Sequence, residues 1–230
     1  MPVTITFHGH STFSIDSDGV KILIDPFFTD NPQAKISADD VEADFILVSH
    51  GHGDHVGDTV AIAKRTGALV IANFEVIGWL GAQGVENIHP LHIGGGNQFP
   101  FGRCKMTIAH HGSGLPDGAY GGNPGGFLLK LNNGVTIYYA GDTALTYDMK
   151  WLADDNVDVA ILPIGDNFTM GPDDALKAVE LIRPATVLPC HYGTWPYIEV
   201  DPQAFKDRCI SEAETGCVLL GAEESYILGQ

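Results

Sequence analysis

Short apolar or alternating segments recur along the chain, and turn residues separate them. Continuous apolar runs of this length are typical of buried β-strands, and alternating runs of half-buried ones. We predict strands at residues 3–7, 20–24, 45–49, 68–72, 106–110, 126–131, 135–140, 157–164, 185–189 and 217–220.

Four segments between these strands have the pattern of amphipathic helices, at residues 58–67, 73–84, 172–184 and 201–216. Asp58 and Gly67 have the residue types that cap a helix at its start and end. Pro172 suits a first helical position, with Asp173 and Asp174 in the first turn. The early strands follow one another directly, whereas later strands alternate with helices, so two sheets with helices outside fit better than one doubly wound parallel sheet.

The length of 230 residues suits one domain with a large core, and we find no internal repeat, low-complexity tract or linker. We therefore expect a single domain over residues 1–230. The formal charge of −17 repels nucleic acid and anionic membrane surfaces, so neither is an expected partner. No apolar run could span a bilayer and no secretory pattern opens the chain, which predicts a cytoplasmic protein. The four cysteines form no C-x-x-C pair, and a homo-oligomer is left open.

The segment HGHGDH, residues 50–55, concentrates three histidines and an aspartate in six positions. It lies between a predicted strand and a predicted helix, a position where α/β proteins place their active and binding sites. We expect its two glycines to let neighbouring imidazoles converge. His50 and His52 can then bind one cation, and Asp54 and His55 a second, because one tetrahedral ion could not take all four. The spacing predicts two metal ions.

Two ions need more ligands than one loop supplies, and other predicted strands end in side chains that bind metals. These are Asp25, His110, His111, Asp142 and His191. If the strand alternates through 110 and 111, only one of its two histidines can face the crevice.

Asp25 precedes HGHGDH, and His111, Asp142 and His191 follow it. This order of residues resembles the metallo-β-lactamase fold over residues 25–191. More narrowly, FHGHSTF, LIDPF, LHIGGG, YAGDTAL, PIGDNFTMGP and PCHYGTWP are similar to small bacterial metal-dependent hydrolases related to ascorbate-6-phosphate lactonases, over nearly the whole chain. The resemblance implies an α+β fold, a four-layer αββα sandwich with the metals at one edge between the sheets.

The resemblance also implies a role for each matched position. The first ion would be held by His50, His52 and His111, and the second by Asp54, His55 and His191. Asp142 would bridge both ions, and Asp25 would orient ligands through hydrogen bonds. His111 is chosen over His110 because the family pattern reads His-Gly-Ser at this point.

Further candidates lie around this expected centre. His10 belongs to the GHS element, and it either lines the site or is a buried structural histidine. The same two interpretations apply to His92. Residues 112–126 form a glycine-rich loop that we interpret as a lid, with Tyr120 able to touch a substrate. Contacts to substrate are also expected from the end of the strand at 157–164, through Asp166, Asn167 and Thr169.

These features predict a metal-dependent hydrolase with a dinuclear centre, in which a bridging hydroxide cleaves a small ester-type substrate, a phosphodiester or a lactone. Asp54 could take or relay a proton. Zinc is the expected metal, although nitrogen and oxygen ligands also accept manganese, nickel and iron. One alternative is a non-catalytic metal-binding or regulatory module. Another is a di-iron redox protein on the same fold, which would favour a carboxylate in place of His52.

Overall fold

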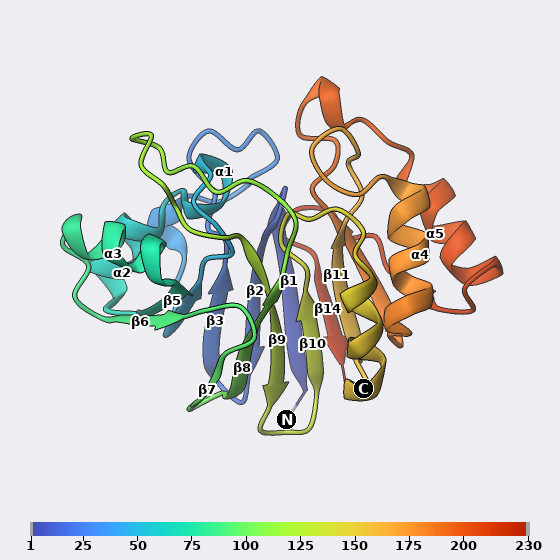
Figure 1. The fold of residues 1–230 in the computed structure, drawn as a ribbon, viewed down its shortest axis with the longest axis horizontal. Helices are drawn as coiled ribbons and strands as arrows, with labels where there is room; N and C mark the ends of the chain where they lie inside the picture. Colours follow the sequence, from blue (N-terminus) through green and yellow to red (C-terminus); the bar gives the residue numbers. More distant parts are fainter. Residues whose placement is uncertain (1, 229–230) are drawn as a thin grey trace.

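Two seven-stranded sheets face each other in the computed structural model, which describes residues 2–228 (Figure 1). The first sheet has the order β14-β1-β2-β3-β4-β5-β6, with β14 at Ser225–Leu228, β1 at Val3–Gly9, β2 at Thr12–Ser17, β3 at Val20–Ile24, β4 at Phe45–Leu47, β5 at Leu69–Asn73 and β6 at Ile88–Leu91. The second has the order β13-β12-β11-β10-β9-β8-β7, with β13 at Gly216–Cys217, β12 at Thr186–Cys190, β11 at Val159–Pro163, β10 at Thr136–Tyr139, β9 at Gly125–Leu131, β8 at Gly102–Ile108 and β7 at Gly96–Phe99.

Strand direction brings the carboxyl ends of several strands together within each sheet. β1, β2 and β3 pair antiparallel, and β3 to β6 pair parallel, so β1, β3 and β4 run the same way. In the second sheet β8, β9 and β10 pair antiparallel, and β10, β11 and β12 pair parallel, so β8, β10 and β12 also share one direction. Any side chain that follows one of these strands therefore lies at a common edge of its sheet.

Helices cover the outer face of each sheet, as the two groups on either side of the strands in Figure 1 show. The first sheet is covered by α2 (Thr59–Thr66) and α3 (Phe74–Ala82), and the second by α4 (Pro172–Ile182), α5 (Pro202–Ser211) and the 3₁₀ helix η2 (Tyr147–Asp155). The remaining helices are short: α1 (Gly53–Val56), η1 (Ala38–Asp40) and η3 (Pro196–Ile198). This arrangement confirms the predicted four-layer αββα sandwich.

Alternation along the strands divides apolar side chains between the layers. On β10, Ile137 and Tyr139 join the core between the two sheets, whereas Tyr138 faces α4 and η2. On β3, Ile22 and Ile24 point inward and Leu23 points to the helices outside. These two strands therefore each supply side chains to two separate hydrophobic clusters, which is why their sequences are continuous apolar runs.

Four strands of the structure were not predicted. Three of them, β6, β7 and β14, lie at sheet edges. An edge strand buries less of its surface, and these contain polar residues or, in β6, Pro90, so their apolar signal is weak. The fourth, β2, alternates buried apolar residues with Ser14 and Asp16.

The predicted cap at Asp58 is wrong in its chemistry. Asp58 occupies the residue before α2 but its side chain makes no capping hydrogen bond. Its carboxylate instead accepts from the backbone N–H groups of Phe28 and Thr29 and from the Thr29 hydroxyl. Gly67 ends α2 in the left-handed conformation, as predicted. None of the helices in residues 2–228 has the length and apolar character needed to traverse a bilayer.

Candidate metal centre

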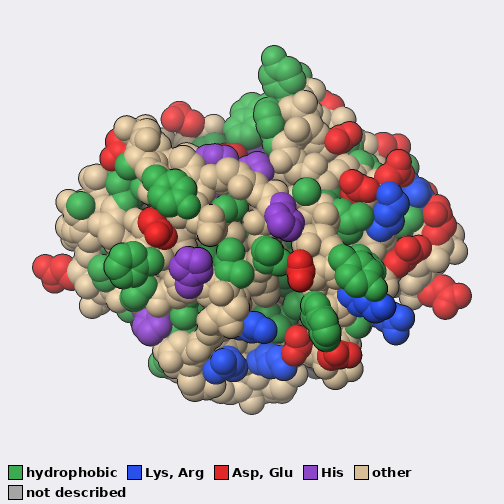
Figure 2. Space-filling view, viewed as in Figure 1, with side chains coloured by type: hydrophobic (Ala, Val, Ile, Leu, Met, Phe, Trp, Pro, Cys, Tyr) green, Lys and Arg blue, Asp and Glu red, His purple; other side chains and the backbone are tan. Residues whose placement is uncertain are grey.

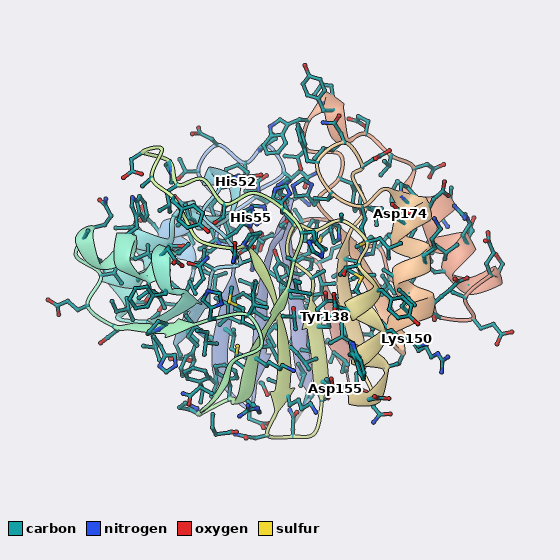
Figure 3. All side chains as sticks on the ribbon, in the orientation of Figure 1. His52, His55, Tyr138, Lys150, Asp155 and Asp174 are labelled. Atoms are coloured by element: carbon teal, nitrogen blue, oxygen red, sulfur yellow. The ribbon has the colours of Figure 1, made fainter. Side chains whose placement is uncertain are left out.

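Six strands end near the same point. In the first sheet these are β1, β3 and β4, which run in one direction, and in the second sheet they are β8, β10 and β12, which also share a direction. His10 follows β1, Asp25 follows β3, His50 follows β4, His111 follows β8, and Asp142 and His191 follow β10 and β12. His52 and His55 lie above the strand ends, whereas Asp155, the last residue of η2, lies much lower in the view (Figure 3). A backbone hydrogen bond of 2.7 Å from His191 N–H to the His10 carbonyl joins the two sheets here.

Three of these residues leave their strands through a strained backbone. His10, Asp25 and His191 have φ angles of 56°, 45° and 53°, a region that side chains with a Cβ rarely adopt. The turn allows each side chain to point into the space between the sheets directly after its strand ends. Strain of this kind persists where the surrounding structure fixes it, and it gathers at functional sites.

The loop after β4 differs from its prediction in two respects. Asp54 and His55 lie on the short helix α1, not on an irregular loop. Neither Gly51 nor Gly53 has a positive φ. A Cβ on Gly51 would lie 3.0 Å from a methyl carbon of Leu115, so close packing, not a left-handed turn, favours glycine there.

The first candidate ligand group consists of His50, His52 and His111, each of which offers a ligating atom within 4.8 Å of the others. Nε2 of His50 is 3.0 Å from Nδ1 of His52. His50 is fully buried, and burial together with the nearby His55 lowers its pKa well below the ordinary value. Burial also lowers the pKa of His111. Both imidazoles are therefore neutral, which is the form that binds metals.

The second group consists of His10, Asp54, His55 and His191, again within 4.8 Å of one another. Nε2 of His10 is 3.1 Å from Oδ2 of Asp54, and its Nδ1 is 2.8 Å from the hydroxyl of Thr194. Burial lowers the pKa of His10 to about 4, so the ring is neutral. Because an ionised carboxylate can only accept, Nε2 carries the proton and donates to Asp54. His10 thus positions the carboxylate of Asp54.

Asp142 lies between the two groups. Its Oδ2 is 3.0 Å from Nε2 of His191, 3.3 Å from Nε2 of His55 and 3.5 Å from Nε2 of His111. Although burial opposes ionisation, His55 and His191 hold the pKa of Asp142 well below its usual range. A permanently ionised, buried carboxylate therefore faces imidazoles from both groups.

Asp25 fixes two histidines through a buried hydrogen-bond network. Its Oδ2 accepts from Nδ1 of His55 at 2.7 Å and from the Ser49 hydroxyl at 2.5 Å, and Tyr139 Oη is also 2.7 Å away. Since the Ser49 proton is directed to Asp25, the contact of 2.9 Å between Ser49 Oγ and His50 Nδ1 requires the imidazole to donate. Nδ1 of His50 and Nδ1 of His55 therefore each donate a hydrogen bond, which fixes the two rings with Nε2 facing the other ligand residues.

The donor set fits metal ions. Nε2 of His55 and Oδ1 of Asp142 are buried and have no hydrogen-bond partner among residues 2–228. Burial disfavours charge on His55, yet Asp142 and Asp25 raise its pKa well above the ordinary value, so this position attracts positive charge. Nitrogen and carboxylate ligands suit zinc, manganese, nickel and iron.

A pocket of about 260 Å³ opens onto the ligand groups. It is lined by His52, Asp54, His111, Asp142, Phe168, His191 and Trp195. Its size is just below that of sites that take small molecules. Histidine side chains gather at the upper end of the molecule, beneath projecting hydrophobic side chains (Figure 2).

Several residues predicted to contact substrate do not line this pocket. His92 and Tyr120 are exposed, the ring of His92 accepts from its neighbour's N–H, and Tyr120 lies 3.4 Å from an oxygen of Asn123. Asp166, Asn167 and Thr169 lie on the turn after β11. It is Phe168, between them, that reaches the pocket. Whether any of these residues contacts substrate stays a prediction, as does the lid at 112–126.

Sequence reasoning did not find Phe168 and Trp195. Both stand inside motifs that the sequence resemblance used, PIGDNFTMGP and PCHYGTWP, but an aromatic residue in a loop carries no signal of which way it points. Their signal is positional: Phe168 lies a few residues after β11 and Trp195 a few residues after β12, and these parallel neighbouring strands end at the same edge of the sheet.

The fold and the cluster at its edge define a metallo-β-lactamase-fold protein. Residues 4–191 match the Beta-lactamase superfamily domain. YhfI of Bacillus subtilis, a metallo-beta-lactamase fold protein, has the same fold, with a TM-score of 0.76 at 12% identity over 98% of this chain and 99% of that one.

Nearer relatives give the particular family. A UPF0173 metal-dependent hydrolase of Carboxydothermus hydrogenoformans is 54% identical over 207 residues, which cover 89% of this chain and 91% of that protein. Igni18, a metallo hydrolase of Ignicoccus hospitalis, superposes with a TM-score of 0.90 at 32% identity, over 100% of both chains. The chain belongs to the UPF0173 family of metal-dependent hydrolases.

Proposed function

We propose that this hydrolase cleaves a small ester-type substrate, a phosphodiester or a lactone, at a centre of two divalent metal ions. One observation carries the proposal: three imidazole Nε2 atoms lie within 3.5 Å of a single oxygen of Asp142, whose other oxygen is buried without a partner among residues 2–228. A buried polar atom without a partner is costly, and bound cations would relieve that cost.

The candidate ligands form two groups, one for each metal ion. The first ion would be held by His50, His52 and His111, and the second by Asp54, His55 and His191, with Asp142 shared between them. Bound divalent ions lower the pKa of a coordinated water toward neutrality and polarise the bond to be cleaved. Zinc is the expected metal, and the ligand types also allow manganese, nickel or iron.

Asp54 is the chain's own candidate for proton transfer. It lines the pocket, and 24% of its side chain is exposed, unlike the deeply buried Asp142. Burial opposes ionisation of Asp54, but the hydrogen bond from His10 holds its pKa well below the usual range. Asp54 is therefore an oriented, ionised carboxylate. Its lowered pKa makes it a weak base, so its role would be to accept a hydrogen bond and relay a proton, not to retain it.

Metal content and turnover, measured together, test this proposal. The purified protein is stripped with a chelator, reloaded with zinc or manganese, and assayed with lactones and with bis(p-nitrophenyl) phosphate. We expect about two ions per chain and turnover of at least one class only after reloading. His52→Ala should lower kcat/KM by more than about 10²-fold, since loss of even a single group that stabilises transition-state charge costs this much.

His110→Ala is the matched control, because His110 is the exposed neighbour of His111 and joins neither candidate ligand group. This variant should keep its metal content and its activity. Metal binding without turnover of any substrate would indicate a non-catalytic module, and equal activity of the stripped and reloaded protein would refute a metal-dependent reaction.

A further inference from the structure

One side of the pocket is a wall of aromatic side chains, formed by Phe168, Trp195 and Tyr197, which we call the aromatic wall. Phe168 and Trp195 line the pocket, and the ring of Tyr197 packs edge to face on that of Phe168 with 6.4 Å between centroids. Phe168 follows β11 and the other two follow β12, so the wall stands beside His191.

The inner part of the wall is fixed and the outer part is open. The ring of Trp195 packs 4.8 Å from that of His10 and 6.3 Å from that of Phe27. By contrast, 51% of Phe168 and 75% of Tyr197 is exposed. Continuous exposed apolar surface next to a functional site marks a place where a ligand is buried.

Among residues 2–228, no lysine or arginine side chain faces a substrate in the pocket. No lysine or arginine is among the residues that line it. On the face shown in Figure 2, Lys and Arg side chains lie along the lower edge and on the right side, away from the histidines nearest the top. A phosphate or carboxylate held away from the metal ions would therefore lose its hydration without gaining an ionic partner.

We propose that the aromatic wall binds an uncharged, planar apolar substituent next to the scissile bond, so that the substrate is a neutral ester, namely a lactone with an aryl group. This inference rests on the proposed function and narrows it. It makes Phe168 and Trp195 the residues that determine specificity, and it disfavours phosphorylated or carboxylated substrates.

Three lactones with the same ring test the preference on the zinc-loaded protein. They are γ-butyrolactone, γ-phenyl-γ-butyrolactone and γ-carboxy-γ-butyrolactone, and acid release reports their hydrolysis. We expect kcat/KM for the phenyl compound to exceed that of the other two by about tenfold or more, which is the scale of one buried aromatic contact. Phe168→Ala should remove about tenfold of this advantage, measured within the variant as the ratio of kcat/KM for the phenyl compound to kcat/KM for γ-butyrolactone.

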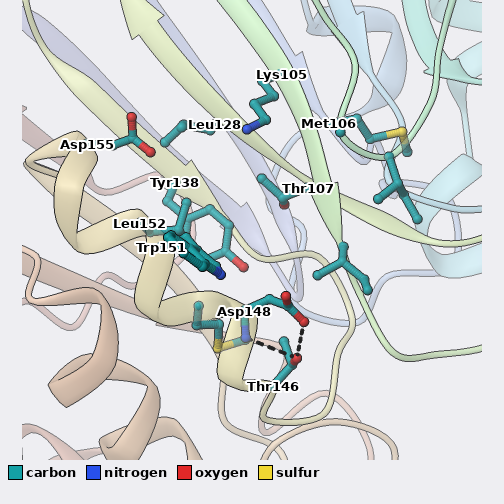
Figure 4. Close-up of a pocket in the computed structure, with 14 residues that line it drawn as sticks. Lys105, Met106, Thr107, Leu128, Tyr138, Thr146, Asp148, Trp151, Leu152 and Asp155 are labelled. Atoms are coloured by element: carbon teal, nitrogen blue, oxygen red, sulfur yellow. Dashed lines mark hydrogen bonds between the residues drawn. The ribbon is translucent and has the colours of Figure 1, made fainter.

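Trp151→Ala is the control for loss of an exposed aromatic residue. Trp151 is 72% exposed and lines a separate cavity of about 310 Å³ between η2 and the second sheet (Figure 4). That variant should retain the phenyl preference. Because Phe168 is also half exposed, Phe168→Ala should fold normally even if replacement of the more deeply packed Trp195 does not.

Binding of an unreactive analogue separates this inference from the proposed function. Calorimetry with 3-phenylcyclopentanone should show binding that Phe168→Ala weakens about tenfold and that cyclopentanone does not match. If no lactone is hydrolysed but this binding holds, the proposed reaction falls and the aromatic wall stands. If lactones are hydrolysed without a phenyl preference, or Phe168→Ala changes neither binding nor rate, the aromatic wall has no role in specificity.

Discussion

In this protein, the residues within the strands, which we call the strand bodies, serve stability, whereas the residues at the carboxyl ends of the strands form the candidate metal centre. All residues of β10 are buried, and Asp142 follows three positions after the last of them. In β12 the four residues after Thr186 are buried, and His191 follows directly after the last of them. In the strand bodies any apolar side chain of suitable volume can fill the space between layers, whereas at the ends single atoms decide the chemistry. Stability and function are therefore carried by neighbouring stretches of the same strands.

The largest expected effect on stability comes from removing an aromatic ring from a strand body. Phe127 on β9 is fully buried between the two sheets. Phe127→Ala should lower the free energy of unfolding by about 3–5 kcal/mol, through lost burial and the cavity left behind. Urea denaturation measures the loss.

The division also predicts that the folded fraction of Phe127→Ala keeps its metal ions and its turnover per folded molecule. Metal content and initial rates at low temperature, where the variant is folded, check this point. Loss of metal binding in a fully folded Phe127→Ala protein would show that metal binding at the strand ends depends on packing within the strand bodies.

A smaller effect is expected at the border between the two regions, where Asp25 ends β3. Asp25→Asn keeps the shape but places an amide where three donors point, so His55 loses the carboxylate that holds its proton on Nδ1. We expect a loss of about 10–100-fold in metal affinity or kcat, the usual cost of removing such a partner.

Asp30→Asn is the control for Asp25→Asn, because Asp30 is an exposed carboxylate in the loop that follows. Competition with a chelator gives the metal affinity of both variants. Unchanged metal affinity and kcat in Asp25→Asn would mean that the ligands do not depend on their hydrogen-bond partners.

The smallest effect concerns a titratable group in a strand body. Burial raises the pKa of Cys104 from 9.0 to about 12. Because the folded pKa is raised, the stabilisation is complete below pH 9 and is lost as the pH rises from about 9 toward 12. At pH 10 the free energy of unfolding should be about 1 kcal/mol lower than at pH 8 through this thiol alone.

Cys104→Ala should remove that part of the alkaline slope, and urea denaturation of both proteins at pH 8 and pH 10 measures it. Parallel pH profiles would contradict a role for this thiol. The contrast with the centre is chemical: burial keeps the thiol of Cys104 neutral and inert, whereas burial lowers the pKa of His50 and His111, whose neutral rings can bind metals.

The sequence predicted the fold class and the residues that meet at the strand ends. It could do so because each candidate ligand directly follows an apolar run, and the chain order of these residues matches a known fold. The edge strands escaped prediction because they bury too little surface to require apolar residues.

The contacts within the centre could not be predicted from the sequence. His10 meets Asp54 and Thr194 across 44 and 184 positions of the chain, and nothing local to His10 indicates either partner. The aromatic wall was missed for the same reason: the direction of Phe168 and Trp195 depends on how two loops pack, not on their own residue patterns. The ligand assignment itself stays a prediction.

Anomalous diffraction from crystals of the zinc-loaded protein tests the central claim most directly. We predict two peaks, one among His50, His52 and His111 and the other among Asp54, His55 and His191, with Asp142 between them. A single peak away from Asp142, or full zinc loading with no peak at these strand ends, would contradict the account.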